Sequence, residues 1–361
     1  MCKFQAEYGA TPRRVKTIDK YGRNAEAHGM TAKPNFVRLD ETDTVVTALR
    51  ALEAGVTVAE VRTTGLVPTG HKIATVAMPK GSPIRKYAQI IGYASEDIAP
   101  GDHVHTHNTA FRNTDHAYEF GTNLRPVAPS SSPDTFNGFR RENGQVGTRN
   151  YIAIVTSVNC SATAARMIAD HFTPERLAPY PHVDGVVAFV HGTGCGMAGD
   201  GEGFEALQRV MWGYAKHPNH AGVLMVGLGC EMNQIDWLLD AYGLSHGPLF
   251  QTMNIQNVAG LKRTVEAGIA KVSAMLPSAN EARRMACPVS DLKVALQCGG
   301  SDAWSGITAN PALGYACDLL VSQGATGVLA ETPEIYGAEH LLTQRAVSKE
   351  VGEKLISLVR W

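Results

Sequence analysis

The chain has 361 residues, of which 44% are hydrophobic and 19% charged, and its formal net charge is −1. This length is sufficient for two or three domains, each with a sizeable core. A chain without net positive charge offers no basic field for nucleic acid, and no run approaches the roughly 20 apolar residues of a membrane span. We therefore expect a protein that binds neither nucleic acid nor a membrane, and, on general grounds, a homo-oligomer.

Residues 1–35 are basic and contain few large aliphatic side chains, so they are predicted to be a flexible N-terminal segment. This segment lacks the apolar stretch of a secretory signal. The seven cysteines of the chain are an odd number without framework spacing. Such cysteines are typical of reduced thiols or metal ligands in the cytoplasm, where we expect the protein to be.

Residues 36–110 contain short runs of alternating apolar residues separated by Gly and Pro, which predicts a small β domain. One helix is expected at 45–54, with Asp43 as its N-cap and Gly55 as its end. Residues 111–137 include a Pro–Ser stretch that cannot build a core, and they are predicted to be a linker.

From residue 138 onward, apolar strands alternate with amphipathic helices, which is typical of a mostly parallel sheet with helices on both faces. The predicted strands are 152–158, 185–190, 222–228, 293–297 and 326–329, and the predicted helices are 162–171, 205–216, 234–242, 258–275 and 311–323. The predicted fold class is therefore α/β, with one domain over 138–361. Because its final helical pattern has no stop signal, we also expect a further C-terminal part.

Cysteines follow four of the predicted strands. Cys160, Cys195 and Cys230 are 35 residues apart, about the length of one strand–helix–strand unit, and Cys298 follows a later strand. Because parallel strands present their carboxyl ends at one edge of a sheet, the four thiols should meet there, with Glu231 beside them. Thiolates with imidazole suit iron or zinc, and the addition of carboxylates favours iron or manganese. The alternative interpretation is that each cysteine is a small buried hydrophobic residue.

Histidines form the second group of candidates. His71 lies between a glycine and a lysine, and His103, His105 and His107 alternate in the segment HVHTHN. On a strand, these three side chains would share one face. Three imidazoles on one face would suit a metal ion or a carboxylate, whereas a solvated histidine strand is the alternative.

Two further loops are candidates for carboxylate binding. Arg149 precedes the first strand of the α/β region, and an arginine fork suits a carboxylate, although an ion-paired entry loop is the alternative. Gly299 and Gly300 lead toward a helix whose N-terminus could seat an anion. The sequence contains no GxxxxGK[ST] phosphate loop and no GxSxG nucleophile elbow, which argues against those nucleotide-binding and hydrolase classes.

Several of these segments resemble a known family. The stretches GFRRENGQVGTRNYIAIVTSVNCSA, HGTGCGM, GLGCE, QCGGSDAWSGITANPALG and ETPEIYGAEHLLTQRA resemble the altronate/galactarate dehydratases. The earlier GHKIA and YAQIIGYASEDIAPGDHVHTHN resemble the SAF (β-clip) domain that precedes the main domain of those enzymes. The resemblance covers about residues 37–361. It implies a SAF-like β domain followed by a Rossmann-like, mostly parallel α/β domain.

The resemblance also implies dehydration of a hexonate or hexarate sugar acid to a 2-keto-3-deoxy acid, with Fe2+ as the metal. Mn2+ is an alternative metal, and an iron–sulfur cluster is less favoured. Carried onto this chain, the catalytic candidates are His71, Lys72 and His191; the substrate-binding candidates are His105, His107, Asn108, Arg149, Gly299, Gly300 and Asp302; and the metal-ligand candidates are Cys160, Cys195, Cys230, Glu231, Cys298 and Glu331.

The implied reaction removes a weakly acidic proton beside a carboxylate and expels hydroxide from the neighbouring carbon. A metal would stabilise the enediolate, His71 or Lys72 would act as the base, and His191 or the metal would assist the departing hydroxide. These roles require the small domain to fold over the sheet, so the expected site lies between domains. The alternatives are a related lyase such as a sulfolactate sulfo-lyase, and a truncated, non-catalytic ligand-binding chain.

Overall fold

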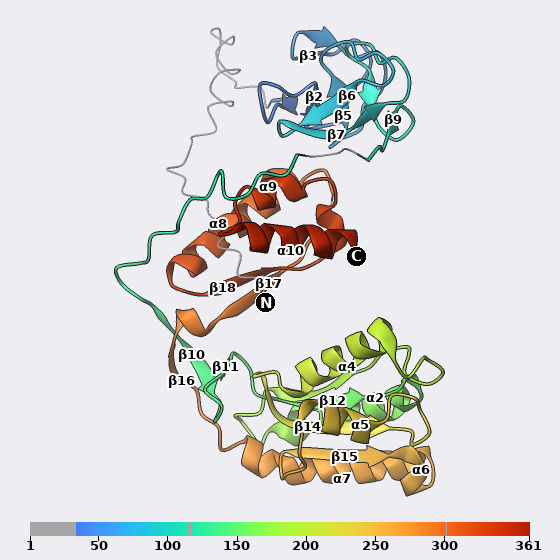
Figure 1. The fold of residues 1–361 in the computed structure, drawn as a ribbon, viewed down its shortest axis with the longest axis vertical. Helices are drawn as coiled ribbons and strands as arrows, with labels where there is room; N and C mark the ends of the chain where they lie inside the picture. The colour runs from blue at the N-terminus through green and yellow to red at the C-terminus, as the bar shows by residue number, and fades with distance from the viewer. Residues whose placement is uncertain (1–33, 114–116, 301) are drawn as a thin grey trace. The chain divides into compact units, whose positions relative to one another are not determined.

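The protein is described by a computed structural model, which covers residues 34–113, 117–300 and 302–361. The predicted flexible segment 1–35 lies almost entirely outside the described residues. The chain forms two compact units (Figure 1). The first unit combines the residues up to Ser130 with Lys293–Trp361, and the second unit is Ser131–Leu292. The region predicted as one α/β domain over 138–361 is therefore divided between the two units.

The N-terminal part of the first unit is built from short antiparallel strands, which fits the predicted small β domain. One sheet has the order β1-β2-β5-β8, and a second has the order β6-β7-β9. The bounds of these strands are Phe36–Val37 (β1), Val45–Ala48 (β2), Lys72–Ala74 (β5), His103–Val104 (β8), Pro83–Lys86 (β6), Gln89–Ala94 (β7) and Thr109–Ala110 (β9), and a small hairpin joins Thr57–Val58 (β3) to Val61–Arg62 (β4).

The predicted helix at 45–54 is wrong, because this segment contains strand β2. Its successive side chains point to opposite sides, as a strand requires, so that Val45 packs into one buried cluster and Val46 into another. Asp43 is not a helix N-cap. Its carboxylate is buried and accepts hydrogen bonds from the N–H groups of Asp40, at 3.0 Å, and Ala88, at 2.8 Å. Pairing with β1 and β5 thus overrides the local helical pattern.

The C-terminal part of the first unit contains a small parallel sheet and several helices. Its two strands, β17 (Lys293–Leu296) and β18 (Thr326–Leu329), pair with each other rather than with the strands of the second unit. The helices are η3 (Ser305–Ala309), α8 (Asn310–Ser322), η4 (Thr332–Ile335), α9 (Glu339–Thr343) and α10 (Lys349–Arg360). The two predicted strands are therefore present, but they build a separate sheet.

The second unit is centred on a four-stranded parallel sheet of order β13-β12-β14-β15. The strands are β12 (Tyr151–Thr156), β13 (Gly185–Phe189), β14 (His220–Gly227) and β15 (Phe250–Asn254). Helices α2 (Ala162–His171) and α7 (Leu261–Ala279) cover one face, whereas α4 (Gly201–Ala215) and α5 (Ile235–Tyr242) cover the other. In Figure 1, α4 and α7 accordingly lie on opposite sides of the sheet. Strand–helix alternation is thus realised as three layers.

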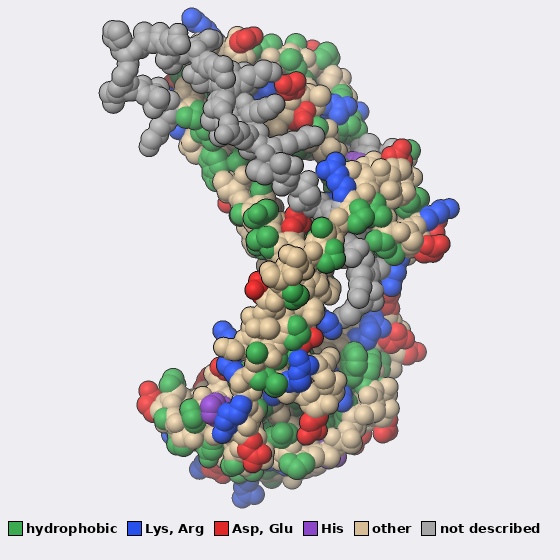
Figure 2. Space-filling view, turned by 90° about the vertical axis from the view of Figure 1, so that its left-hand side faces the viewer, with side chains coloured by type: hydrophobic (Ala, Val, Ile, Leu, Met, Phe, Trp, Pro, Cys, Tyr) green, Lys and Arg blue, Asp and Glu red, His purple; other side chains and the backbone are tan. Residues whose placement is uncertain are grey.

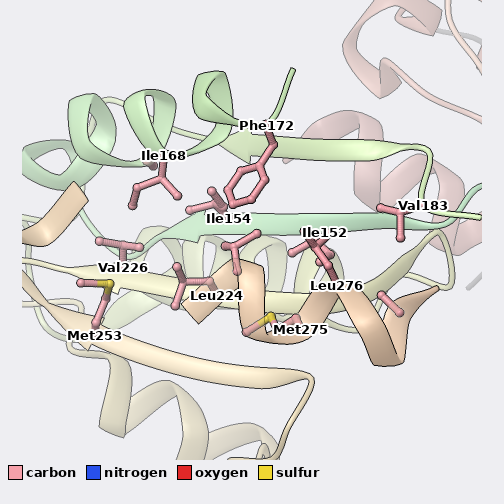
Figure 3. Close-up of a cluster of buried hydrophobic side chains, with 13 residues drawn as sticks. Ile152, Ile154, Ile168, Phe172, Val183, Leu224, Val226, Met253, Met275 and Leu276 are labelled. Atoms are coloured by element: carbon pink, nitrogen blue, oxygen red, sulfur yellow. The ribbon is translucent and has the colours of Figure 1, made fainter. Parts of the chain in front are cut away.

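The core of this unit shows how the sequence pattern produces the layers. Ile168 and Phe172 descend from the α2 side onto Ile152 and Ile154 of β12, and Met275 approaches the sheet from α7 (Figure 3). All are at most 9% exposed. Burying one such aliphatic or aromatic side chain contributes about 1.5–3 kcal/mol, so this face fixes the strand and helix positions.

The remaining elements were not anticipated from the sequence or are short. The antiparallel strands β10 (Thr135–Arg140), β11 (Val146–Gly147) and β16 (Met285–Pro288) form a sheet of order β11-β10-β16, and the short helices are η1 (Asn159–Ser161), α3 (Pro174–Leu177), α6 (Ile255–Val258) and η2 (Val289–Asp291). The predicted linker has no regular secondary structure over its described residues 117–134, and β10 begins inside its last three residues.

The described surface agrees with the charge balance of the sequence. Acidic and basic side chains are interspersed over the face shown in Figure 2, without a continuous field of one sign. Within the described residues, no helix combines the length and apolar character needed to cross a bilayer.

Candidate functional site

The first unit gathers four imidazoles, here called the histidine cluster: His71, His103, His105 and His107. The Nδ1 of His71 lies 2.8 Å from the Nε2 of His103, so one of these two ring nitrogens donates a hydrogen bond to the other. The His71 ring also stacks on His105 with a centroid distance of 4.7 Å, and His107 lies 5.3 Å from His103. His71, which the sequence marks only as a further candidate, therefore lies next to the other three imidazoles.

A turn, rather than an extended strand, brings these imidazoles together. Only His103 lies on a strand, β8, and residues 105–108 form the turn between β8 and β9. Asn108 holds this turn: its Oδ1 accepts a hydrogen bond from the N–H of His105 at 2.9 Å, and its Nδ2 donates to the His103 carbonyl at 3.0 Å. The side chain of Asn108 is 4% exposed, so its observed contacts shape the turn rather than face a ligand.

Burial and repulsion between neighbouring imidazoles disfavour the charged forms of His71 and His103. Desolvation, with contributions from the other three imidazoles and Lys72, lowers the pKa of His103 to about 4. Desolvation also lowers the pKa of His71, and it lowers the pKa of the half-buried Lys72 amine. Neutral imidazoles and an amine with a depressed pKa are the groups that proton transfer at neutral pH requires.

The glycine loop after β17 packs directly against this region. A Cβ placed on Gly70 would lie 2.9 Å from the Cβ of Ala303, so the turn before His71 and the segment around Ala303 are in contact. The Asp302 carboxylate accepts hydrogen bonds from the N–H groups of Trp304 and Ser305, at 2.9 and 2.8 Å, and these bonds lower the pKa of Asp302. Asp302 therefore shapes the start of η3.

The neighbouring candidates in this loop differ in their surroundings. A Cβ on Gly300 would meet open space, so its backbone is accessible. A Cβ on Gly299 would meet only the far end of Gln297, at 3.9 Å. The Glu331 carboxylate is occupied by Gln297 Nε2 at 2.9 Å and the N–H of Cys298 at 3.0 Å, which lower the pKa of Glu331. The backbone at Gly299 and Gly300 is therefore accessible, whereas the Glu331 carboxylate stabilises the loop.

The second unit brings three of the predicted thiols to the carboxyl edge of its parallel sheet. Cys160 follows β12, Cys195 follows β13 and Cys230 follows β14, and all three are exposed. We call these three residues the thiol edge. Desolvation raises the pKa of the Cys160 thiol, and the nearby thiols of Cys195 and Cys230 raise it further. Cys298 follows β17 and belongs to the first unit.

Glu231 supports the thiol edge from the interior and does not face outward. Its carboxylate is 2% exposed. It accepts hydrogen bonds from the Ser157 hydroxyl at 2.6 Å and from the N–H groups of Leu228 at 3.1 Å and Gly229 at 2.6 Å. This carboxylate therefore ties the loop after β14 to the end of β12. Because Ser157 is 74 positions away, no local sequence pattern signals this contact.

His191 and Arg149 lie at different ends of the parallel sheet, and their predicted roles stay predictions. Both ring nitrogens of His191 are engaged: Nε2 lies 2.9 Å from the Thr156 carbonyl, and Nδ1 accepts from the N–H of Thr193 at 3.3 Å. These contacts fix the orientation of its ring and support the loop. Arg149 precedes the six-residue strand β12, whereas Cys160 follows it, so they lie at opposite ends of a strand about 20 Å long. Arg149 cannot hold a carboxylate at the thiol edge.

The metal-ligand set implied by the resemblance is therefore not assembled as one site in either unit. Across the described parts of the chain, no group of three or more His, Cys, Asp or Glu side chains is arranged to hold a metal ion. The carboxylates of Glu231 and Glu331 accept hydrogen bonds from neighbouring loop groups. Cys298 belongs to a different unit from the other three thiols. Within the described residues of either unit, a mixed thiolate–carboxylate site for a single Fe2+ is therefore not formed.

Comparisons with known proteins assign all three regions of the chain to one family. Residues 34–112 match the altronate/galactarate dehydratase SAF domain, residues 138–280 match the second domain of D-galactarate dehydratase/altronate hydrolase, and residues 289–361 match the D-galactarate/altronate dehydratase C-terminal domain. The boundary near residue 289 agrees with the division between the two units at Leu292.

Curated relatives are similar over most of this chain. An altronate dehydratase of Bacillus subtilis is 36% identical over 337 residues, which cover 90% of this chain and 65% of the relative. The galactarate dehydratase (L-threo-forming) of Escherichia coli is 34% identical over 354 residues, or 94% of this chain and 67% of the relative. A (2R)-sulfolactate sulfo-lyase subunit beta of Chromohalobacter salexigens is 32% identical over 220 residues, or 61% of this chain and 52% of the relative. The chain thus spans about two thirds of the length of the dehydratases that it matches, and it belongs to the altronate/galactarate dehydratase family.

Proposed function

We propose that the protein is a hydro-lyase that removes water from an aldonate or aldarate, giving a 2-keto-3-deoxy acid. The observation that supports this proposal best is the histidine cluster beside Lys72, because it supplies proton-transfer groups within a domain that matches the dehydratase SAF domain. The two dehydratase relatives are similar over at least 90% of this chain, whereas the sulfo-lyase subunit covers 61%. A sugar-acid substrate is therefore favoured over sulfolactate.

The reaction starts with a proton that is hard to remove. Lys72 is our candidate for the base, because desolvation lowers the pKa of its amine and so increases its neutral fraction. Lys72 would take the proton from the carbon beside the carboxylate, and the released electron pair would form a carbon–carbon double bond as the neighbouring hydroxyl leaves. The proton held on Lys72 can depart with that hydroxyl as water. The resulting enol then tautomerises to the 2-keto acid.

Neutral imidazoles suit the charge that develops during this elimination. His71 and His103 share one hydrogen bond, and the N–H groups of the cluster that remain available can donate to the enediolate oxygen. An imidazolium would be a stronger acid, but the pKa of His103, at about 4, keeps this ring neutral near pH 7. The accessible backbone around Gly300 is our candidate for holding a substrate carboxylate.

We also assign the parallel sheet of the second unit to the Rossmann-like folds, on the strand order β13-β12-β14-β15 and the helices on both faces. In such sheets, ligands bind beyond the carboxyl ends, where the strand order reverses. Here that point lies between β12 and β14, next to Cys160 and Cys230.

The test is product formation on a panel of altronate, galactarate and (2R)-sulfolactate, followed by NMR in D2O with the full chain kept under reducing conditions. We expect a 2-keto-3-deoxy acid from at least one sugar acid, with one solvent deuteron at C3 after tautomerisation. Release of sulfite from sulfolactate without turnover of either sugar acid would assign the chain to the sulfo-lyases instead. Inactivity on every substrate, in a folded and reconstituted sample, would contradict the proposal.

A further inference from the structure

The first unit contains a cavity of about 720 Å3, which is within the usual size range of small-molecule sites. One wall is formed by β7 and the segment after β9, and the other by the region from η4 to α9 and the end of α10. The Tyr336 hydroxyl joins the walls by donating to Asn113 Oδ1 at 3.1 Å. A second link runs from His340 Nε2 to Gln89 Oε1, at 3.0 Å. Among the described residues that line this cavity, none belongs to the histidine cluster, and Lys72 is also absent from its walls.

Large apolar side chains line the cavity although they are accessible to solvent. Phe111 is 71% exposed, Tyr336 48% and Ile91 38%. The rings of Phe111 and Tyr336 lie 6.2 Å apart, and the Arg112 guanidinium lies over the Tyr93 ring at 5.3 Å from its centroid. Exposed apolar side chains that gather at a concave site are typical of ligand binding, because a ligand can bury its own C–H surface against them.

One buried carboxylate, that of Glu339, also belongs to the cavity lining. Glu339 begins α9 and is 4% exposed, and its Oε2 has no hydrogen-bond partner within the described parts of the chain. A buried acceptor of this kind costs free energy until a donor satisfies it. Because an ionised carboxylate only accepts hydrogen bonds, the partner that fits Glu339 carries hydroxyl or N–H groups.

Two arginines determine the charge of that partner. Arg112 and Arg360 both line the cavity, and neither forms an ion pair with another described residue. Glu339 supplies the acidic side chain among the described lining residues, so positive charge is in excess. This excess disfavours an ammonium ligand and favours an anion. Guanidinium groups pair with carboxylates through two parallel hydrogen bonds, so a carboxylate that also carries hydroxyl groups matches the whole set.

We propose that this cavity binds a sugar acid, with its carboxylate against Arg112 or Arg360 and a hydroxyl group donating to Glu339. The site is separate from the histidine cluster, so it takes a second molecule rather than the one that reacts. Because its walls come from residues 87–118 and 306–360, a bound molecule also stabilises the first unit. The binding claim rests on the cavity alone, whereas the identity of the ligand as substrate or product rests on the proposed function.

The experiment is amide hydrogen exchange of the full chain carrying Lys72→Met, so that the proposed turnover does not consume the ligand. Altronate and galactarate should slow exchange in residues 89–94 and 336–341, which lie in the two walls. Adipate is galactarate without its hydroxyl groups, and galactitol has hydroxymethyl groups in place of the carboxylates. Both compounds, and inorganic phosphate, should protect these segments less than the sugar acids do.

Substitutions in the cavity should weaken this protection selectively. Arg112→Gln and Glu339→Gln should each raise the sugar-acid concentration for half-maximal protection by about tenfold or more, as expected for loss of a hydrogen bond to a charged group. Any protection of residues 103–108, in the histidine cluster, should stay the same. The matched controls are Arg125→Gln and Glu96→Gln, at exposed positions outside the cavity lining. Calorimetric unfolding without ligand checks that each variant folds.

The outcomes separate this proposal from the proposed function. Protection confined to residues 103–108, or no protection by either sugar acid, would overturn the second site. Wall protection that survives both Arg112→Gln and Glu339→Gln, or that adipate, galactitol or phosphate produces equally, would overturn the assigned ligand chemistry. Turnover is measured separately with Lys72 in place. Wall protection without turnover would reject the dehydratase function and leave the cavity site intact, and turnover without wall protection would do the reverse.

Discussion

The histidine cluster and the thiol edge both bring together side chains that are distant in the sequence, but by different structural means. The histidine cluster combines His71, next to one antiparallel strand, with a tight turn that Asn108 holds. The thiol edge uses three parallel strands whose carboxyl ends lie side by side. A local turn positions most of the histidines, whereas the pairing of parallel strands positions the three cysteines.

This difference separates two kinds of chemistry. The histidine cluster presents His71 and His103, whose pKa values are lowered, and such imidazoles suit proton transfer near pH 7. The thiol edge presents three exposed thiols on loops that are joined to one another by backbone hydrogen bonds. Substitutions in the first region should therefore change proton-transfer rates, whereas substitutions in the second should change loop stability.

The largest effect is expected for Lys72→Met, which keeps most of the side-chain stem but removes the amine. Loss of a general base should reduce turnover of the accepted sugar acid by about 10²- to 10⁴-fold. Steady-state kinetics measures this turnover, and Lys80→Met, at an exposed turn of the same domain, is the control. Turnover within a factor of two of the unsubstituted protein would remove Lys72 from the mechanism.

The next effect is on stability and concerns Glu231→Gln. The amide would place a donor opposite the N–H of Gly229 or the Ser157 hydroxyl, so one buried group loses its partner. We expect the free energy of unfolding of the second unit to fall by about 1–3 kcal/mol. Calorimetric unfolding of the full chain measures this change in stability. The control is Glu202→Gln, at an exposed residue in the first turn of α4. An unchanged unfolding temperature would show that the carboxylate does not clamp the loop.

A third expectation concerns pH and applies to the histidine cluster. Desolvation and the neighbouring imidazoles lower the pKa of His103 from 6.5 to about 4, so the unfolded chain takes up a proton that the folded chain does not. The stability contributed by neutral His103 is complete above about pH 6.5 and is lost as the pH falls toward 4. The unfolding temperature of the first unit should fall over that range, and His103→Gln should flatten the dependence. An equally steep dependence in His103→Gln, with exposed His246→Gln as the comparison, would contradict this cause.

The smallest effect is expected for Arg149→Ala. Arg149 is exposed and lies at the amino end of β12, away from the thiol edge. Turnover and stability should stay within about 0.5 kcal/mol of the unsubstituted protein, as for most surface substitutions. The same kinetic and calorimetric measurements apply. A large loss of activity with an increased KM would show that Arg149 binds substrate, although it lies at the amino end of β12.

The sequence by itself determined the features that depend on short-range pattern. Helix 162–171 was predicted with the bounds that α2 has, and the first three parallel strands were located to within two residues. The 35-residue spacing of Cys160, Cys195 and Cys230 sufficed to place them at one edge, because consecutive parallel strands end at the same edge of their sheet. Resemblance to the family added the SAF domain, which the matching family model confirms.

Only the tertiary structure decided which side chains turn outward and which sheet each strand joins. Glu231 is adjacent to Cys230, yet a hydrogen bond to Ser157, 74 positions away, directs it into the interior. Cys298 ends a parallel strand as the other three cysteines do, but that strand pairs with β18 in the other unit. Residues 45–48 have a helical pattern and form a strand because two neighbouring strands supply their hydrogen bonds. In each case the deciding partner is distant along the chain, so no local pattern could encode it.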